Sequence, residues 1–263
     1  MQFRKPPVVE VWISVEFEPN ENKRDFDRNR LDALVEQLHV EFPKRQVIGE
    51  RTIEVQETTA SELPRVVNQE VRLQGVRLWD ETRSRAVLIG DDRLEVHLLK
   101  TADVIPGFRR VREATEPRLA EYVHTFQPVG IRSAALHYLD IVDIPVPDSG
   151  ELNLQDYFTY VVDLPKSPFG TTTHVAQEFQ LNCPVDAGPL FLRLQSMPES
   201  QDSEVARFRV EWHKQSLEVD SLDASVVWER LEKAHDYMRD CFKALLSERT
   251  LELFEPIPET DEN

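Results

Sequence analysis

Arginine and histidine residues recur along the polar faces of the strands that this sequence predicts. The set consists of Arg72, Arg77, Arg85, Arg93, His97, Arg193, Arg207, Arg209 and His213. Guanidinium groups bind carboxylates and phosphates through paired, charge-assisted hydrogen bonds. If these strand faces converge on one concave sheet surface, they form a basic groove that suits an acidic peptide or a phosphate-bearing ligand. The candidate ligand- or partner-binding residues are Arg72, Arg77, Arg93, His97, Arg207, Arg209 and His213.

A second interpretation gives the same arginines a structural role. Arginine is tolerated in strands, where it can pair with an acidic side chain on a neighbouring strand. The sequence offers Glu70, Glu95 and Glu211 as partners of this kind. From the sequence alone both interpretations are open, and each predicts that the arginines lie on polar strand faces.

The chain lacks the common catalytic and cofactor signatures. Its eight glycines form no phosphate-binding loop, dinucleotide-binding fingerprint or nucleophile elbow. Its histidines and cysteines show no metal-binding spacing, so a metal site would have to be assembled from distant strands. Asp140 and Asp143 lie three residues apart on one predicted strand and point to opposite faces, which disfavours a carboxylate pair for acid–base catalysis. The sequence therefore predicts no catalytic residue, no cofactor and no metal.

Other polar and aromatic residues are expected to be structural. The tryptophans Trp12, Trp79, Trp212 and Trp228 are expected in the core or packed on the sheet, with base stacking by an exposed pair as the alternative. His235 lies beside the apolar stripe of the last predicted helix. It is expected to be a hydrogen-bonded core histidine.

One order of predicted elements occurs twice along the chain. The first pass has a strand over 8–17, a helix over 31–42, strands over 46–57, 69–79, 85–89 and 93–99, and a helix over 108–126. The second has a strand over 130–144, a short helix over 152–160 capped at Asn153 or a neighbouring residue, strands over 173–183, 190–196 and 205–214, and a helix over 221–246. The predicted fold class is α+β: two pseudo-repeated β-α-β(3–4)-α halves form a mainly antiparallel curved sheet backed by helices. The arrangement is similar to saddle-like and helix-grip folds.

The predicted organisation is an N-terminal half over 1–127, a C-terminal half over 128–255 and a disordered acidic tail over 256–263. A formal net charge of −17 favours solubility and attraction to a basic protein, and disfavours nucleic acid and anionic lipid. No apolar run approaches the ~18 residues that span a bilayer, and no secretory signal is expected. The expected location is therefore the cytoplasm, and the oligomeric state is open.

Four short motifs carry a resemblance to a known family. They are Pro6-Pro7-Val8-Val9-Glu10-Val11 with Phe17-Glu18-Pro19, Tyr138-Leu139-Asp140-Ile141-Val142-Asp143-Ile144-Pro145, Leu154-Gln155-Asp156-Tyr157-Phe158, and a last helix with Leu231, His235, Phe242, Leu251 and Phe254. Together they resemble a family of sporadically distributed bacterial and archaeal proteins of about this length, without an assigned activity. In that family the middle strand usually begins with Arg-Tyr and carries Asn, where this chain has His137-Tyr138 and Asp140. The resemblance implies a cytoplasmic accessory protein from a mobile, defence or toxin–antitoxin context, and supplies no catalytic residue.

The sequence thus favours a non-enzymatic cytoplasmic binding protein, antitoxin-like or defence-associated. Its expected partner is a more basic protein encoded nearby. The alternative is an enzyme or a small-ligand or anion sensor that uses a basic cavity on the sheet face, with His97 and His213 near the site. A nucleic-acid binder is disfavoured by the net charge unless the arginines cluster tightly.

Overall fold

The computed structural model describes residues 2–18, 28–56, 65–149, 152–161, 174–182, 188–198, 204–216 and 222–257. For residues 2, 50–56, 65–72 and 216 it describes the backbone only. Nine of the described strands form one antiparallel sheet, in the order β3-β4-β5-β6-β2-β7-β10-β9-β8. Two short strands, β1 (Gln2–Phe3) and β11 (Pro256–Ile257), pair separately.

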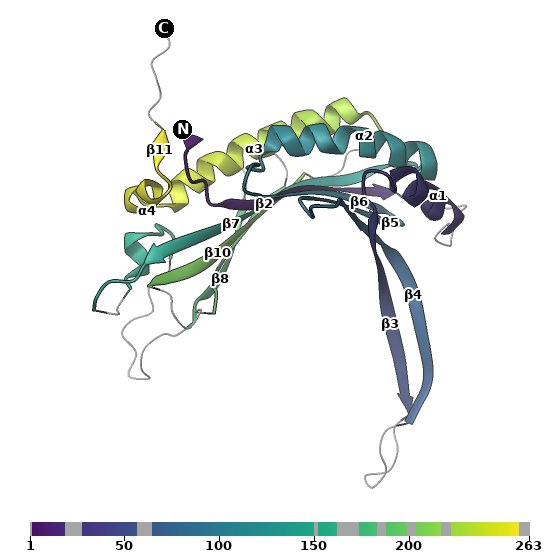
Figure 1. The fold of residues 1–263 in the computed structure, drawn as a ribbon, viewed down its shortest axis with the longest axis horizontal. Helices are drawn as coiled ribbons and strands as arrows, with labels where there is room; N and C mark the ends of the chain where they lie inside the picture. The colour runs from purple at the N-terminus through teal and green to yellow at the C-terminus, as the bar shows by residue number, and fades with distance from the viewer. Residues whose placement is uncertain are drawn as a thin grey trace.

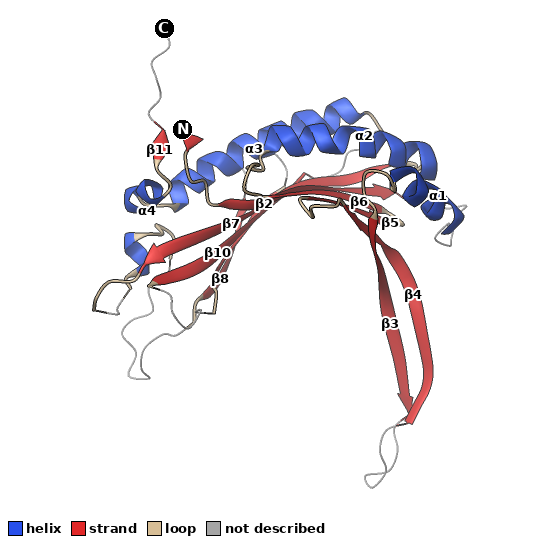
Figure 2. Cartoon of the chain, viewed as in Figure 1, coloured by secondary structure: helices blue, strands red, loops and turns tan. Residues whose placement is uncertain are grey.

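The strands of the large sheet are β2 (Val8–Glu18), β3 (Lys44–Gln56), β4 (Arg65–Trp79), β5 (Arg85–Gly90), β6 (Arg93–Leu99), β7 (Gly130–Pro145), β8 (Ala176–Asn182), β9 (Pro189–Ser196) and β10 (Val205–Ser216). The helices are α1 (Arg28–Leu38), α2 (Phe108–Phe126), α3 (Ala224–Leu245) and α4 (Glu248–Leu253), with a single 3-10 turn, η1 (Leu154–Asp156). The sheet bends into an arch, and α1 to α4 lie on its convex side (Figure 1). None of these four helices covers the concave side (Figure 2). At one end of the arch, β3 and β4 continue away from the body as a long hairpin (Figure 1).

β2 shows why the sheet has one buried face and one open face. Its alternate residues Val11, Ile13, Val15 and Phe17 are buried on the helix side, as the two-residue period of a strand requires. The intervening side chains, including Trp12, point to the concave side. β2 pairs with β7 at the centre of the sheet. The two halves of the chain therefore share one continuous β-layer.

Tyr122 fixes α2 to the sheet. Its ring stacks on Phe17 of β2, with the ring centroids 4.3 Å apart. Its buried hydroxyl donates to the carbonyl oxygens of Gly90 at 3.1 Å and Asp91 at 2.9 Å, in the β5–β6 turn. Burial raises the pKa of Tyr122, so the hydroxyl stays protonated and remains a donor. One side chain thus ties a helix to a strand and a turn.

The long helix α3 packs on the other half of the sheet. The predicted apolar stripe is buried at Val227, Leu231, Ala234, Met238 and Leu245, and its sixth member, Cys241, is half-buried. The helix begins after Asp223, whose carboxylate accepts a hydrogen bond from the backbone N–H of Ser225 at 2.8 Å. Within the described ranges, no helix is both long and apolar enough to cross a membrane.

A close backbone contact lies where β4 joins the body of the sheet. Gly75 of β4 is opposite Gly90 of β5. A Cβ added to Gly75 would lie 2.4 Å from the carbonyl oxygen of Ile89, which real Cβ atoms do not approach. Only glycine fits between the two strands here without a backbone shift.

The α+β class and the antiparallel sheet backed by helices are confirmed. The helix predicted over 108–126 has those bounds, and the predicted Asn153 cap accepts from the backbone N–H of Gln155. The helix predicted over 152–160 is wrong beyond its first turn. Phe158 is fully buried and forms a β-bridge to Leu246, which takes the chain out of the helix and into the core.

The two ends of the described chain meet. Gln2–Phe3 pairs with Pro256–Ile257, and the backbone N–H of Arg4 donates to Glu255 O at 3.0 Å. The ring of Phe3 meets that of Phe254 edge to face, with centroids 5.6 Å apart. The sequence predicts disorder from Pro256 onward, but these contacts hold Pro256 and Ile257 in β11; residues 258–263 lie outside the described residues.

Candidate functional site

Five neighbouring strands each contribute one ring to a row that crosses the concave face. In sheet order the row consists of His97 (β6), Trp12 (β2), His137 (β7), His213 (β10) and Phe191 (β9). Successive members are directly opposite each other in the strand register. Their ring centroids are 5.5, 4.4, 4.3 and 5.6 Å apart in that order. We call these five residues the ring row.

The ring row follows from strand pairing rather than from any sequence motif. Cross-strand neighbours on one face of a sheet lie close enough for flat side chains to contact each other. The interplanar angle is 11° between Trp12 and His97 and 9° between Trp12 and His137. The indole thus lies in a stack between two imidazoles. The result is a strip of flat rings on the uncovered side of the sheet.

Two carboxylates enclose the His97 end of the row. His97 Nδ1 lies 2.8 Å from Glu10 Oε1, and its Nε2 lies 3.1 Å from Glu95 Oε2. Burial alone would lower the pKa of His97, but hydrogen bonds and charge interactions with these two carboxylates outweigh it and raise the pKa. Burial alone would raise the pKa of Glu95. The hydrogen bond and charge interaction with His97 outweigh burial and bring the pKa of Glu95 below its ordinary value. This end of the row therefore favours an imidazolium between two carboxylates.

The centre of the row favours neutral imidazoles. Burial lowers the pKa of His137 well below its ordinary value, and the nearby His213 and His97 lower it further. The Ser14 hydroxyl and His137 Nε2 share a hydrogen bond of 3.0 Å. Burial also lowers the pKa of His213, although Glu16 partly opposes it. Charge is thus confined to the His97 end, and the middle of the row is uncharged.

Two of the predicted arginines, Arg207 and Arg209 of β10, pair with acids. Arg207 donates from Nε and Nη2 to the two carboxylate oxygens of Asp143 on β7, at 2.6 and 2.8 Å. Arg209 forms an ion pair with Glu211 on its own strand. Both arginines lie on the same face of β10 as His213, because the three are separated by even numbers of residues.

Arg93 and Arg77 lie toward the other end of the sheet. Arg93 pairs with Glu16 at 3.4 Å and with Glu95 at 3.5 Å. The guanidinium of Arg77 lies over the Trp79 ring, 5.9 Å from its centroid. The Nε atom of Arg77 is buried and has no hydrogen-bond partner among the described residues.

The remaining bases are more dispersed. The backbone of Arg72 lies in β4, but its side chain falls outside the described residues. Arg85 contacts Glu41 at 2.6 Å, beside α1 and α2 on the convex side, and so does not belong to the concave face. Arg193 lies on β9, opposite Glu211. The predicted pair His97 and His213 does reach the ring row, with two other rings between them.

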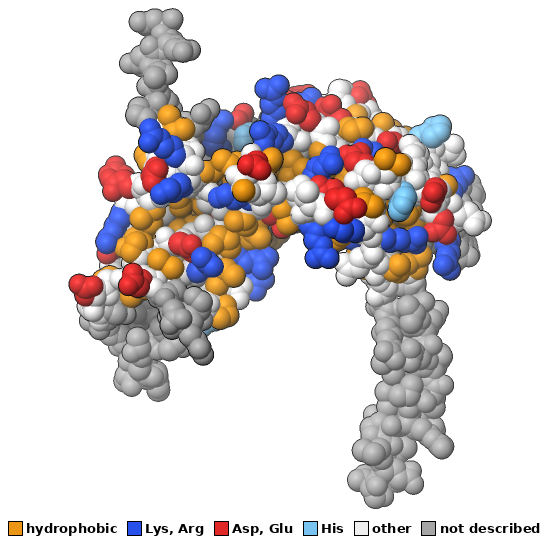
Figure 3. Space-filling view, viewed as in Figure 1, with side chains coloured by type: hydrophobic (Ala, Val, Ile, Leu, Met, Phe, Trp, Pro, Cys, Tyr) orange, Lys and Arg blue, Asp and Glu red, His pale blue; other side chains and the backbone are white. Residues whose placement is uncertain are grey.

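The concave face is therefore a surface of mixed charge rather than a basic groove. Pairing across strands, as the structural interpretation expects, occurs for Arg207 with Asp143 and for Arg93 with Glu16, which are not the expected acids. Two of the expected acids, Glu95 and Glu211, instead pair with Arg93 and Arg209 of their own strands. Charged side chains of both signs are also interspersed over the surface that Figure 3 shows. The role of the candidate residues in partner binding stays a prediction.

Sequence reasoning missed the middle of the site. The sequence predicts that Trp12 packs in the core or on the sheet, with base stacking as the alternative, and it predicts no site at His137. In the structure both lie at the centre of the ring row. The available signal was their position between apolar strand residues, which places them on the face opposite the core. Their contact across β2 and β7 depends on the register, which no local pattern reveals.

The ring row offers flat apolar surface with ionised groups at its edges. In the part of the chain that the structure describes, no group of three His, Cys, Asp or Glu side chains is placed to hold a metal ion. No family model matches the chain, and a search of curated proteins returns no match. Function is therefore inferred from the geometry of the ring row and from the charges around it.

Proposed function

We propose that this chain is a non-enzymatic binding protein whose concave face receives a protein partner, with the ring row at the centre of the contact. One observation carries the proposal: a continuous strip of rings lies on the sheet face that α1 to α4 leave uncovered (Figure 2). Rings that serve only the core normally lie on a sheet face that helices or a second sheet cover.

The concave face has the layout of a protein interface. Interfaces place aromatic side chains at a desolvated centre and polar groups at a rim that stays wet. Trp12 and Phe191 are half-buried in the ring row and retain surface for a partner. The paired charges of Arg207 with Asp143 lie on strands β10 and β7 beyond the row and supply a polar rim. Rim pairs of this kind add specificity more than affinity.

Charge favours a basic partner. The net charge of −17 attracts cationic proteins over distance. Carboxylates of Glu10, Glu16 and Glu95 lie beside the row, where they would repel the phosphates of a stacked nucleic acid. The net charge and the carboxylates beside the row both fit a basic protein partner. Such a partner would be encoded near this chain and neutralised by it in a cytoplasmic antitoxin-like or defence role.

We further propose that the two halves of the chain are a pseudo-repeat. The strand order supports this, because the strand before each long helix pairs with the first strand of its own half: β6 with β2, and β10 with β7. The two first strands then pair with each other at the centre. A repeat of this kind would place the ring row across the junction of the halves.

Affinity capture with matched variants tests the proposed docking face. The full chain, immobilised at low salt, is expected to retain a basic protein from its host, and high salt is expected to release it. After identification, the purified partner is titrated against the wild type, Trp12→Ala and Arg109→Ser. Arg109 lies on α2, on the convex side, and is the control. Loss of a central tryptophan is expected to weaken binding at least about 30-fold, while the control binds normally.

Two results would contradict the proposed docking face. One is recovery of the chain alone at low salt. The other is a partner that Trp12→Ala binds as tightly as the wild type, with both proteins shown to be folded by circular dichroism. A folded Arg207→Ser, Arg209→Ser variant separates the rim from the centre, since it is expected to alter the salt dependence more than the affinity.

The alternative, an anion sensor on the same face, is favoured by one observation. The buried Nε of Arg77 has no hydrogen-bond partner among the described residues. Inorganic phosphate that binds the wild type and not Arg77→Gln would support this function in place of protein docking.

A further inference from the structure

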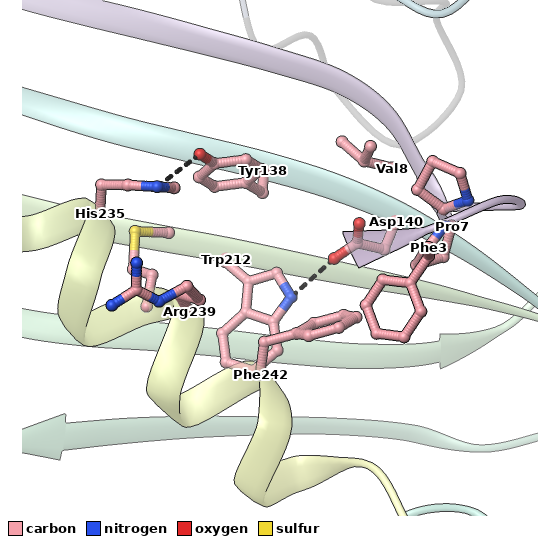
Figure 4. Close-up of a pocket in the computed structure, with 11 residues that line it drawn as sticks. Phe3, Pro7, Val8, Tyr138, Asp140, Trp212, His235, Arg239 and Phe242 are labelled. Carbon is pink, nitrogen blue, oxygen red and sulfur yellow. Dashed lines mark hydrogen bonds between the residues drawn. The ribbon is translucent and has the colours of Figure 1, made fainter. Parts of the chain in front are cut away.

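A pocket of about 170 Å³ lies on the helix side of the sheet, on the face opposite the ring row. It is enclosed by α3, by strands β7 and β10, and by the chain segment that leads into β2 (Figure 4). The lining residues are Phe3, Pro6, Pro7, Val8, Tyr138, Asp140, Trp212, His235, Met238, Arg239 and Phe242. Most of this surface is apolar, and the polar groups are few.

The positions of the lining residues follow from the secondary structure. His235, Met238, Arg239 and Phe242 are spaced three and four residues apart, so they lie on one face of α3. Tyr138 and Asp140 are two residues apart on β7 and face the same side. Trp212 of β10 is directly opposite Tyr138. Rigid elements therefore build three sides of the pocket.

The carboxyl of Asp140 is the main polar group of the pocket. Asp140 is buried, and its Oδ2 accepts a hydrogen bond from Trp212 Nε1 at 3.0 Å (Figure 4). It has no ion pair within the described chain. Arg239, the lining residue with a permanent positive charge, pairs with Asp236 at 3.1 Å and with Asp240 at 3.7 Å. The carboxyl thus lies in apolar surroundings with one neutral donor.

A second polar contact lies beside it. The Tyr138 hydroxyl and His235 Nδ1 share a hydrogen bond of 2.9 Å, and the His235 ring stacks on Phe108, with centroids 4.8 Å apart. His235 is therefore hydrogen-bonded at the edge of the core, as the sequence predicts. Burial lowers its pKa, so it is neutral near pH 7 and does not compensate the carboxyl.

The size of the pocket limits what it can hold. An apolar protein cavity of about 150 Å³ accommodates benzene, so this pocket suits one ring with a small substituent. The aromatic side chains of Trp212 and Phe242 are among its lining residues. A carboxylate in such surroundings is stabilised by a cationic or multiply donating N–H group, because a buried charge otherwise lacks a partner.

We propose that this pocket binds a small aromatic cation, an amine or amidine carried on one ring, whose N–H groups donate to Asp140 while the ring packs against Trp212 and Phe242. The site is separate from the proposed docking face and does not depend on it. Binding would turn an unpaired buried carboxyl into a hydrogen-bonded ion pair.

Burial also predicts how binding depends on pH. It raises the pKa of Asp140 to about 7, although the hydrogen bond from Trp212 opposes the rise. A cation needs the ionised form, so its affinity is expected to increase from pH 6 to pH 8. The other titratable groups that line the pocket are Tyr138 on β7 and His235 and Arg239 on α3; β10 and the N-terminal segment contribute no titratable side chain.

Calorimetric titration of the full chain with benzamidine tests the proposed site, with benzyl alcohol as a neutral probe of similar size. We expect benzamidine to bind the wild type more tightly at pH 8 than at pH 6, and Asp140→Asn to bind it at least tenfold more weakly. Asp143→Asn, altered on the opposite face of the same strand, is expected to bind like the wild type.

Three results would overturn the inference. They are no binding of benzamidine at millimolar concentration, equal affinity for benzamidine and benzyl alcohol, and unchanged binding by a folded Asp140→Asn variant. None of them bears on the docking of a protein at the ring row, since Trp12 and Asp140 lie on opposite faces of the sheet.

Discussion

Replacing Asp140 by asparagine removes a buried acidic group while the new side chain fills the same space. The amide has nearly the shape of the carboxyl, and its oxygen can still accept the hydrogen bond from Trp212 Nε1. What changes is the response to pH. The wild-type carboxyl is 4% exposed, and burial raises its pKa from 3.8 to about 7.

The sign of the effect follows from proton binding. Between pH 3.8 and 7 the folded state holds a proton on Asp140 that the unfolded state has released, so raising the pH destabilises the wild type. At about 1.36 kcal/mol for each pH unit, the full effect is roughly 4 kcal/mol, complete above pH 7. Roughly 2 kcal/mol of it falls between pH 5.5 and 8.5. Asp140→Asn lacks this loss and should gain stability relative to the wild type over that interval.

Urea unfolding of both proteins at pH 5.5 and 8.5, followed by tryptophan fluorescence, measures the difference. Asp143→Asn is the control, because Asp143 is exposed on the concave side and pairs with Arg207. The reasoning about burial is refuted if the stability difference between Asp140→Asn and the wild type is the same at the two pH values. It is also refuted if Asp143→Asn shows an equal pH-dependent gain.

Three other substitutions have defined outcomes. His97→Gln is expected to lose more stability at pH 5.5 than at pH 8.5. The raised pKa of His97 stabilises the folded state fully below pH 6.5, the ordinary pKa of histidine, and this contribution disappears as the pH rises through the folded-state pKa. Equal losses in urea unfolding at the two pH values would contradict this. Tyr122→Phe removes both hydrogen bonds to the β5–β6 turn and should cost about 1 kcal/mol in the same assay; no loss would mean that the turn is held by packing alone. Gly75→Ala forces a Cβ against the carbonyl of Ile89 and should cost about 1–3 kcal/mol in thermal unfolding; a variant as stable as the wild type would show that the two strands can separate freely.

The sequence predicts the elements of the fold well because their signals are local. The alternation of Val11, Ile13 and Val15 marks a half-buried strand, and the apolar stripe of α3 marks a helix packed on one side. Failures occur where a distant contact overrides the local pattern. The β-bridge between Phe158 and Leu246 ends the short helix, and the pairing of the two chain ends orders Pro256.

The candidate site was less predictable for the same reason. Arg207 and Arg209 carry the same pattern whether they are free or paired, and only the register of β10 against β7 brings Asp143 to Arg207. The ring row likewise requires the order of five strands, which skips across the sequence. The pocket needs even more: α3, two strands and the N-terminal segment must pack before Asp140 has apolar surroundings.

One wall of the pocket is formed by the N-terminal segment, which is held in place by its pairing with the C-terminal end of the described chain. Phe3 belongs to a two-residue strand that pairs with an equally short strand near the other end of the described chain, and Pro6 and Pro7 continue this wall. The other walls belong to the sheet and to α3. The contacts that hold this segment are local: the short ladder, two backbone hydrogen bonds from Arg4 and Lys5, and the ring contact of Phe3 with Phe254. Separating them costs less free energy than unfolding the sheet and α3. Displacement of this terminal segment would therefore widen the pocket while the sheet and the ring row stay intact.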